Sequence, residues 1–249
     1  MPSVYISPST QERNFGVGGY GSEEAQMNAI ADLLVPELER HGLTVYRNHP
    51  RMTLKEVIRD SNAKKPDAHV AIHSNAGGGK GTEIWILARG GRAEKLAEAI
   101  YKHVAPLSPG KDRGIKESRY FGELSDTVAP AVIVELGFHD DPQEAKWIMS
   151  SRIAIAFALA RGICEFFGIK YCPREPESKA EPAPQAGRSA GTSSADAPTA
   201  GGQASVVLVP NAPMSNRSGE LWFGDGYAGR GIYVRDDDGW HLVWLKPKE

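Results

Sequence analysis

A change in composition at residue 173 divides the chain. Residues 173–203 contain no Val, Ile, Leu or aromatic residue, but five prolines among many Ala, Gly and Ser. Such a stretch cannot bury enough apolar surface to offset its chain entropy. The sequence therefore predicts three parts: a domain over residues 1–172 that is large enough to be catalytic, a flexible linker over 173–203 and a small module over 204–249.

Within residues 1–172, short β-branched runs alternate with amphipathic stretches. Met27, Ile30, Leu34 and Leu38 share one face of an expected helix, and Gly42 ends it. Further helices are expected at 54–62, 92–104 and 150–167, and strands at 4–6, 44–47, 69–73, 82–87 and 131–136. Strand–helix alternation of this kind predicts an α/β domain, a sheet with helices on both faces.

Three polar residues stand where an ordinary core would not place them. Glu24 continues the apolar series of the first helix, so it is expected in the first turn on the buried side. His73 closes a strand, just before the chain must leave the sheet. Glu135 lies inside the apolar run 131–138, where a carboxylate is costly to bury unless it is paired, metal-bound or protonated.

The ends of these strands indicate where a site would form. Ile6, His73 and Glu135 all lie at the carboxyl ends of expected strands, where open α/β sheets gather their ligands. A mixed oxygen and nitrogen site beside a free acid is what a hydrolytic zinc centre requires. The metal polarises a carbonyl and activates water, and a partly desolvated carboxylate transfers the proton to the departing amine.

A set of collinear motifs resembles the zinc-dependent N-acetylmuramoyl-L-alanine amidases, the amidase 3-like group of phage endolysins and autolysins. The motifs are Glu24 followed by Asn28, Ser61-Asn62 ahead of Asp67, Ile72-His73-Ser74-Asn75-Ala76, Gly81-Thr82-Glu83 and Val134-Glu135-Leu136-Gly137-Phe138. The resemblance covers about residues 3–169. It implies a three-layer α/β/α fold and hydrolysis of the bond between the lactyl group and L-alanine in peptidoglycan. It also implies that Glu24 and His73 hold zinc and that Glu135 is the catalytic acid/base.

One motif departs from the family pattern. The family has Asp-Pro-Gly-His-Gly after its first strand, and its histidine is a zinc ligand, whereas this chain has Ser7-Pro8-Ser9-Thr10-Gln11. The Gln11 amide oxygen is the favoured replacement, with the Thr10 hydroxyl as a weaker candidate. Alternatively, His139 swings in from the loop after Glu135, or the site has lost its metal and its activity.

The last 46 residues become apolar again and contain Trp222, Trp240 and Trp244. Several short runs separated by Gly, Asp and Asn predict a small all-β module, weakly similar to SH3-like wall-binding modules. Tryptophan suits stacking on sugar rings, but these aromatic residues are equally expected to fill a small core.

The net charge and the N-terminal sequence narrow the expected binding partners and the expected location of the protein. The formal net charge of −2 gives no global field for nucleic acid, and no apolar run is long enough for membrane insertion. The start lacks the features of a signal peptide, so synthesis in the cytoplasm and action on the cell wall after phage or mother-cell lysis are expected. Two other functions stay open: a non-catalytic peptidoglycan-binding protein on a degenerate amidase fold, and a zinc carboxypeptidase-like amidohydrolase.

Overall fold

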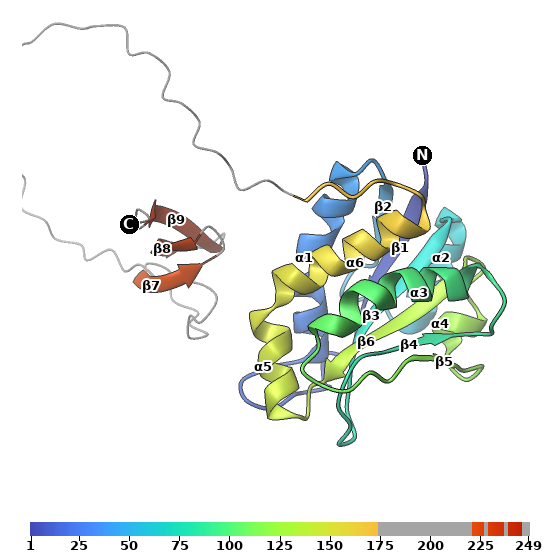
Figure 1. Ribbon diagram of the computed structural model, residues 1–249, viewed down its shortest axis with the longest axis horizontal. Coiled ribbons are helices and arrows are strands. Elements are labelled where there is room, and N and C mark those ends of the chain that lie inside the picture. Colours follow the sequence, from blue (N-terminus) through green and yellow to red (C-terminus); the bar gives the residue numbers. More distant parts are fainter. Residues whose placement is uncertain (174–220, 227–228, 237–238, 246–249) are drawn as a thin grey trace, which may run out of the picture. The chain divides into compact units, whose positions relative to one another are not determined.

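The computed structural model describes residues 1–173, 221–226, 229–236 and 239–245. The chain divides into two units, Met1–Arg174 and Glu175–Glu249 (Figure 1). The expected linker at 173–203 lies almost wholly outside the described residues. The site lies in the first unit, so that unit is described in more detail.

The first unit alternates strands and helices, as its sequence pattern predicts. Its strands are β1 (Ser3–Pro8), β2 (Thr44–Arg47), β3 (Ala68–Asn75), β4 (Glu83–Ile86), β5 (Ile115–Glu117) and β6 (Ala131–Phe138). Its helices are α1 (Glu23–Arg40), α2 (Leu54–Lys64), α3 (Arg92–Val104), the 3₁₀ turn η1 (Ala105–Leu107), α4 (Gly122–Ser125), α5 (Pro142–Ser150) and α6 (Arg152–Phe166). The mixed α/β class is therefore confirmed.

The six strands form one sheet in the order β2-β1-β3-β6-β4-β5. The neighbours β1, β2, β3 and β6 run parallel, whereas β4 runs antiparallel to β6. Parallel neighbours bring the carboxyl ends of β1, β3 and β6 to one edge. The reversed β4 brings its first residue, Glu83, to that same edge, opposite Glu135.

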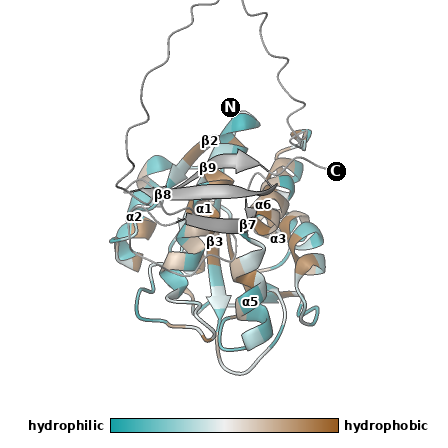
Figure 2. Ribbon diagram, turned by 90° about the vertical axis from the view of Figure 1, so that its left-hand side faces the viewer, coloured by the Kyte–Doolittle hydropathy of each residue, from teal (hydrophilic) through white to brown (hydrophobic). Residues whose placement is uncertain are grey.

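The main core lies between the sheet and the helices α1, α3 and α6. Along β3, Val70 and Ile72 point into this core. The helices cover it with one apolar side each, and in Figure 2 they carry both hydrophobic and hydrophilic residues. This arrangement buries the even-numbered side chains of β3 and leaves the odd-numbered ones on the other face of the sheet.

Among the described residues, α2 and α4 are the helices that cover the other face of the sheet. Ser61 of α2 hydrogen-bonds His69 of β3, and Leu124 of α4 packs with Ala71 and Ile133 in a small second cluster. The cavity of the candidate site lies on this face and is lined in part by Val57 of α2, Glu123 of α4 and Ile133 of β6.

Four elements of the first unit were not expected from the sequence. They are β5, η1, α4 and α5, which are three, three, four and nine residues long. In elements this short, a helical or strand period cannot repeat often enough to be recognised. Among the described residues no single helix is long and apolar enough to cross a membrane, although the bent pair α5–α6 meets the length and composition criteria together.

The second unit contains a three-stranded antiparallel sheet. Its strands are β7 (Leu221–Gly226), β8 (Gly229–Asp236) and β9 (Gly239–Leu245), in the order β7-β8-β9. The SH3-like character and wall-binding role expected for residues 204–249 stay predictions.

Candidate active site

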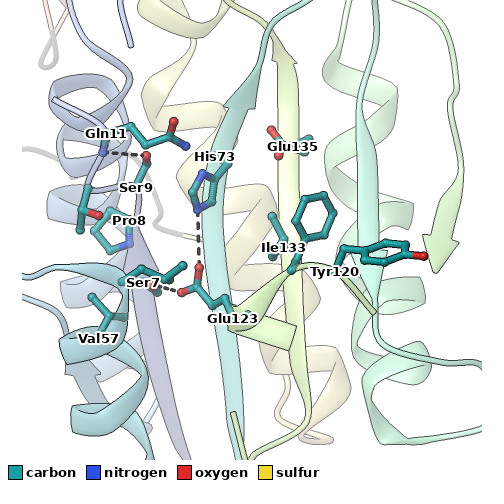
Figure 3. Close-up of a pocket in the computed structure, with 14 residues that line it drawn as sticks. Ser7, Pro8, Ser9, Gln11, Val57, His73, Tyr120, Glu123, Ile133 and Glu135 are labelled. Carbon is teal, nitrogen blue, oxygen red and sulfur yellow. Dashed lines mark hydrogen bonds and ion pairs between the residues drawn. The ribbon is translucent and has the colours of Figure 1, made fainter. Parts of the chain in front are cut away.

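A cavity of about 320 Å³ opens at the carboxyl ends of β1, β3 and β6 (Figure 3). Its lining comes from the loop after β1, from α2, from α4 with the residues before it, and from the strand ends. The lining residues are Ser7, Pro8, Ser9, Thr10, Gln11, Leu54, Val57, His73, Tyr120, Phe121, Gly122, Glu123, Ile133 and Glu135. Three of the four residues predicted for the site, Gln11, His73 and Glu135, therefore line one cavity.

Glu135 has the environment of an acid/base group. It lies in β6 directly beside His73 of β3 in the strand register. Its Oε2 atom is buried and has no hydrogen-bond partner. Burial raises the pKa of this carboxyl to about 7, because little around it stabilises the charged form. A carboxyl with such a pKa can both accept and release a proton near neutral pH.

His73 contacts a carboxylate on each side of its ring. Glu23 Oε1 lies 2.8 Å from His73 Nδ1, and Glu123 Oε2 lies 3.7 Å from Nε2. Burial alone would lower the pKa of His73, but the carboxylates of Glu123 and Glu23 outweigh this effect and raise it well above the usual value. The imidazole is thus held in one orientation at the edge of the cavity.

The carboxylate beside His73 belongs to Glu23 and not to Glu24. The Ser22 side chain caps α1 by accepting the Ala25 N–H, so helix α1 begins at Glu23. Glu23 is fully buried, and its other oxygen accepts a 2.6 Å hydrogen bond from Asn14. Glu24 is only half-buried, and its carboxylate accepts from Asn28 one turn along the same helix. The expectation that Glu24 lies on the buried side is wrong by one residue.

The reason is that the apolar series does not fix which residue of the first helical turn lies on the buried face. Extrapolating the series Met27, Ala31, Leu34 back by three residues gives Glu24, whereas extrapolating by four gives Glu23. Both spacings occur on one helical face. The contact with His73 decides between them, because it brings Glu23 toward the strand ends.

Glu123 of α4 holds the side of the His73 ring opposite Glu23. It is buried, and its Oε1 atom lies 2.9 Å from His69 Nε2 and also accepts from the Ser7 hydroxyl. The far side of the His69 ring lies 2.9 Å from the Ser61 hydroxyl. Burial would raise the pKa of Glu123, but hydrogen bonds with His69 and His73 outweigh it and hold that pKa far below its usual range. His69 therefore supports the site indirectly and does not enter the cavity.

The three residues considered as replacements for the missing histidine differ in their positions. The Gln11 side chain is exposed, lines the cavity and extends on the same side as His73 (Figure 3). Thr10 lines the cavity as well. Both ring nitrogens of His139 are already engaged, Nδ1 with Ser74 and Nε2 with Asn14, and its ring stacks on Tyr20. The structure thus places His139 as a support for the Asn14 loop.

The donors present fit a metal of the hydrolytic type. Glu23 and His73 form a carboxylate–imidazole pair in direct contact, and the unpaired Oε2 of Glu135 lies at the neighbouring strand position. Across the described ranges, no three His, Cys, Asp or Glu side chains form a metal-binding group. The carboxamide of Gln11 and the hydroxyl of Thr10 are oxygen groups that line the same cavity, and Gln11 Oε1 accepts a 3.4 Å hydrogen bond from Asn14.

Sequence reasoning missed Glu23, Glu123 and Glu83. Glu23 adjoins the residue that was chosen, so its signal was present. Glu123 lies in the single-turn helix α4, which carries no periodic pattern. Glu83 was noted as part of a motif, but its position opposite Glu135 depends on the antiparallel pairing of β4 with β6.

Comparison with known proteins gives one consistent result. Residues 4–165 match the family described as N-acetylmuramoyl-L-alanine amidase. The N-acetylmuramoyl-L-alanine amidase CwlM of Bacillus licheniformis is 26% identical over 178 residues, 68% of this chain and 70% of that protein. The sporulation-specific N-acetylmuramoyl-L-alanine amidase of Bacillus subtilis is also 26% identical, over 68% of this chain and 70% of that protein.

The solved structures agree in fold. The catalytic domain of CwlV, an N-acetylmuramoyl-L-alanine amidase from Bacillus (Paenibacillus) polymyxa var. colistinus, superposes with a TM-score of 0.63. That match covers 68% of this chain and all of the CwlV domain, at 24% identity. The amidase from Clostridium difficile 630 gives 0.62 at 23% identity, over 67% of this chain and 97% of the other. The shared region is the first unit.

Proposed function

Because the chain belongs to the N-acetylmuramoyl-L-alanine amidase family, we propose that it hydrolyses the lactyl–L-alanine amide bond of peptidoglycan in the cavity beside Glu135. The observation that carries the proposal is Glu135 itself: a buried carboxyl with an unpaired oxygen and a pKa near 7, next to the Glu23–His73 pair. Such a group is expected at a site of proton transfer.

We further propose that Glu23 and His73 hold a zinc ion, with Gln11 as the third protein ligand. A zinc ion there would polarise the scissile carbonyl and the attacking water. Asn14 orients Glu23, and Glu123 holds the far edge of the His73 ring. Residues that fix the orientation of metal ligands in this way tune metal affinity.

Glu135 performs the proton transfers in this proposal. As the C–N bond of the amide breaks, hydroxyl from water is added to the lactyl carbonyl carbon and a proton to the nitrogen of L-alanine. Glu135 takes the proton from the attacking water and delivers it to the departing nitrogen. Its intermediate pKa lets one carboxyl do both, and positioned proton transfer contributes on the order of 10²–10⁴ in rate.

The test is the isosteric variant Glu135→Gln. It should fold and retain zinc like the wild type, but hydrolyse soluble muropeptides at least about 10² times more slowly. The matched control is Glu98→Gln, an exposed glutamate of α3 on the other side of the sheet. Near wild-type turnover by Glu135→Gln would remove Glu135 from the mechanism.

One observation favours the non-catalytic alternative. The stretch 7–11 lacks the family's histidine, and among the described residues no His, Cys, Asp or Glu side chain completes a three-residue metal group. A peptidoglycan-binding protein on this fold would bind muropeptides without zinc and without releasing a free L-alanine amine. Zinc content and product analysis on the same preparation separate the two functions.

A further inference from the structure

A second charged group lies beside the catalytic carboxyl, on the opposite side of β6 from His73. Glu83 of β4 pairs directly with Glu135 of β6, so both side chains leave the sheet on the same face. Glu83 is only 2% exposed. Its Oε1 atom accepts hydrogen bonds of 3.0 Å from Asn75 and from the Trp85 indole.

Two cations share the other oxygen of Glu83. Arg113 Nε and Lys116 Nζ both donate to Oε2, and their side chains are 31% and 32% exposed. Burial alone would raise the pKa of Glu83, but the two cations outweigh this and keep it below the usual value. Glu83 is therefore charged at neutral pH, and the group of three carries a net charge of about +1.

The cations retain unused hydrogen-bonding capacity. Arg113 uses Nε for Glu83, while neither of its Nη atoms hydrogen-bonds any residue that the structure describes. Its guanidinium lies 4.9 Å from the Phe138 ring centroid, and Lys116 Nζ lies 5.1 Å from that of Trp85. Both cations are thus held in place by an aromatic ring and a carboxylate. An arginine presented this way is prepared for bidentate binding of a carboxylate.

Arg113 and Lys116 lie outside the lining of the cavity, on its β5 side. None of the residues that line the cavity is a lysine or an arginine. The loop after β1 and helix α2 contribute polar and apolar side chains there, whereas Arg113 and Lys116 lie beyond Glu135 on the β5 side. An anionic group of the substrate would therefore be stabilised on that side.

We propose that Arg113 and Lys116 form a binding site for a free carboxylate of the stem peptide, close to the scissile bond. This inference rests on the proposed function. In peptidoglycan the residue after L-alanine is a glutamate linked through its side chain, which leaves its α-carboxyl group as an acid or, in some walls, as an amide. The peptide thus runs from Glu135 toward β5, and the full chain prefers stems with the free acid.

The experiment compares two soluble muramyl peptides that differ only in this group, α-carboxylate or α-carboxamide. The wild-type full chain should show a kcat/KM about tenfold or more higher on the carboxylate, as expected for a charge-assisted hydrogen bond. Arg113→Gln and Lys116→Met should each lose most of this preference, measured as the ratio of kcat/KM on the two peptides. Each single variant leaves Glu83 paired with the other cation, so the fold is retained.

Lys95→Met is the matched control, since Lys95 is an exposed lysine of α3 on the other face of the sheet. It should keep the wild-type preference. Equal cleavage of the two peptides by the wild type would overturn the inference. An equal loss of kcat/KM on both peptides in the Arg113 and Lys116 variants would also overturn it, because such a loss would indicate a purely structural role.

A binding measurement separates this inference from the proposed function. Calorimetric titration of Glu135→Gln with the same two peptides reports recognition without turnover. The inference is supported if Glu135→Gln binds the carboxylate form more tightly and the double variant Glu135→Gln, Arg113→Gln does not. This holds even if the wild type cuts neither peptide. Equal binding of the two forms overturns it even if the wild type is an active amidase.

Discussion

At the scale of single residues, the choice between adjacent glutamates determines the metal prediction. Glu23 contacts His73, while Glu24 contacts Asn28 in its own helix. We expect Glu23→Ala to lose most of its zinc and Glu24→Ala to retain a content close to the wild type. Metal analysis after dialysis against a weak chelator measures this. The opposite ranking would show that Glu24 turns inward when zinc is bound.

The pKa of Glu135 gives a second prediction, on stability. A carboxyl whose pKa rises from 4.5 to about 7 on folding binds more protons in the folded state between those values. The free energy of unfolding should therefore fall as the pH rises from 4.5 to 7, by at most about 3 kcal/mol. Below pH 4.5 the carboxyl is protonated in both states and the effect vanishes.

Glu135→Gln, which does not titrate, provides the reference for this effect. In zinc-free protein it should be more stable than the wild type at pH 8, and the difference should shrink toward pH 4.5. Urea unfolding of both proteins at several pH values measures it. Parallel stability curves would show that Glu135 is as well solvated in the folded state as in the unfolded chain.

At the scale of elements, the short helix α5 holds the segment before β4 and the end of β6. Its buried Glu144 accepts the backbone N–H groups of Gly81 and Phe138, both at 2.6 Å. Glu144→Ala would leave both donors without a partner, so we expect the free energy of unfolding to fall by about 2 kcal/mol or more. Chemical denaturation measures the loss.

Gln143→Ala is the control for this prediction, because Gln143 is exposed and occupies the same first turn of α5. Its stability should stay within about 0.5 kcal/mol of the wild type. Similar losses in both variants would attribute the effect to the helix and not to the two hydrogen bonds.

At the scale of the whole molecule, the division of the chain into two units predicts that the first unit folds by itself. Its core is made of residues between Val4 and Cys164 together with partly buried hydrophobic residues up to Tyr171. Truncation after residue 172 should give a cooperative, soluble domain that cuts soluble muropeptides at the full-chain rate. On purified walls it should sediment less, if residues 204–249 raise the local concentration there.

Two outcomes would contradict this arrangement. Equal sedimentation of the truncated and full chains would remove the wall-binding role from residues 204–249. Aggregation of the truncated domain would show that the first unit needs the rest of the chain to cover apolar surface. Light scattering and wall pull-down of both proteins distinguish these results.

The sequence by itself determined the class of the domain and the type of chemistry. Apolar periodicity located the long helices and central strands, because burial of one face imposes a period along the chain. The unusual carboxylate in the apolar strand made Glu135 a candidate site residue, and the strand-end position made His73 another; both line the cavity. These features are local, so they can be read without knowing which segments meet.

Only the tertiary structure decided which side chains meet. The contact with His73 selected Glu23 over Glu24, a choice that the periodicity left between neighbouring residues. The single-turn helix α4 placed Glu123 beneath His73, and the antiparallel pairing of β4 placed Glu83 and its two cations beside Glu135. Strand order and pairing direction bring together residues distant in the chain, and no local pattern encodes them, because they follow from how the whole core packs.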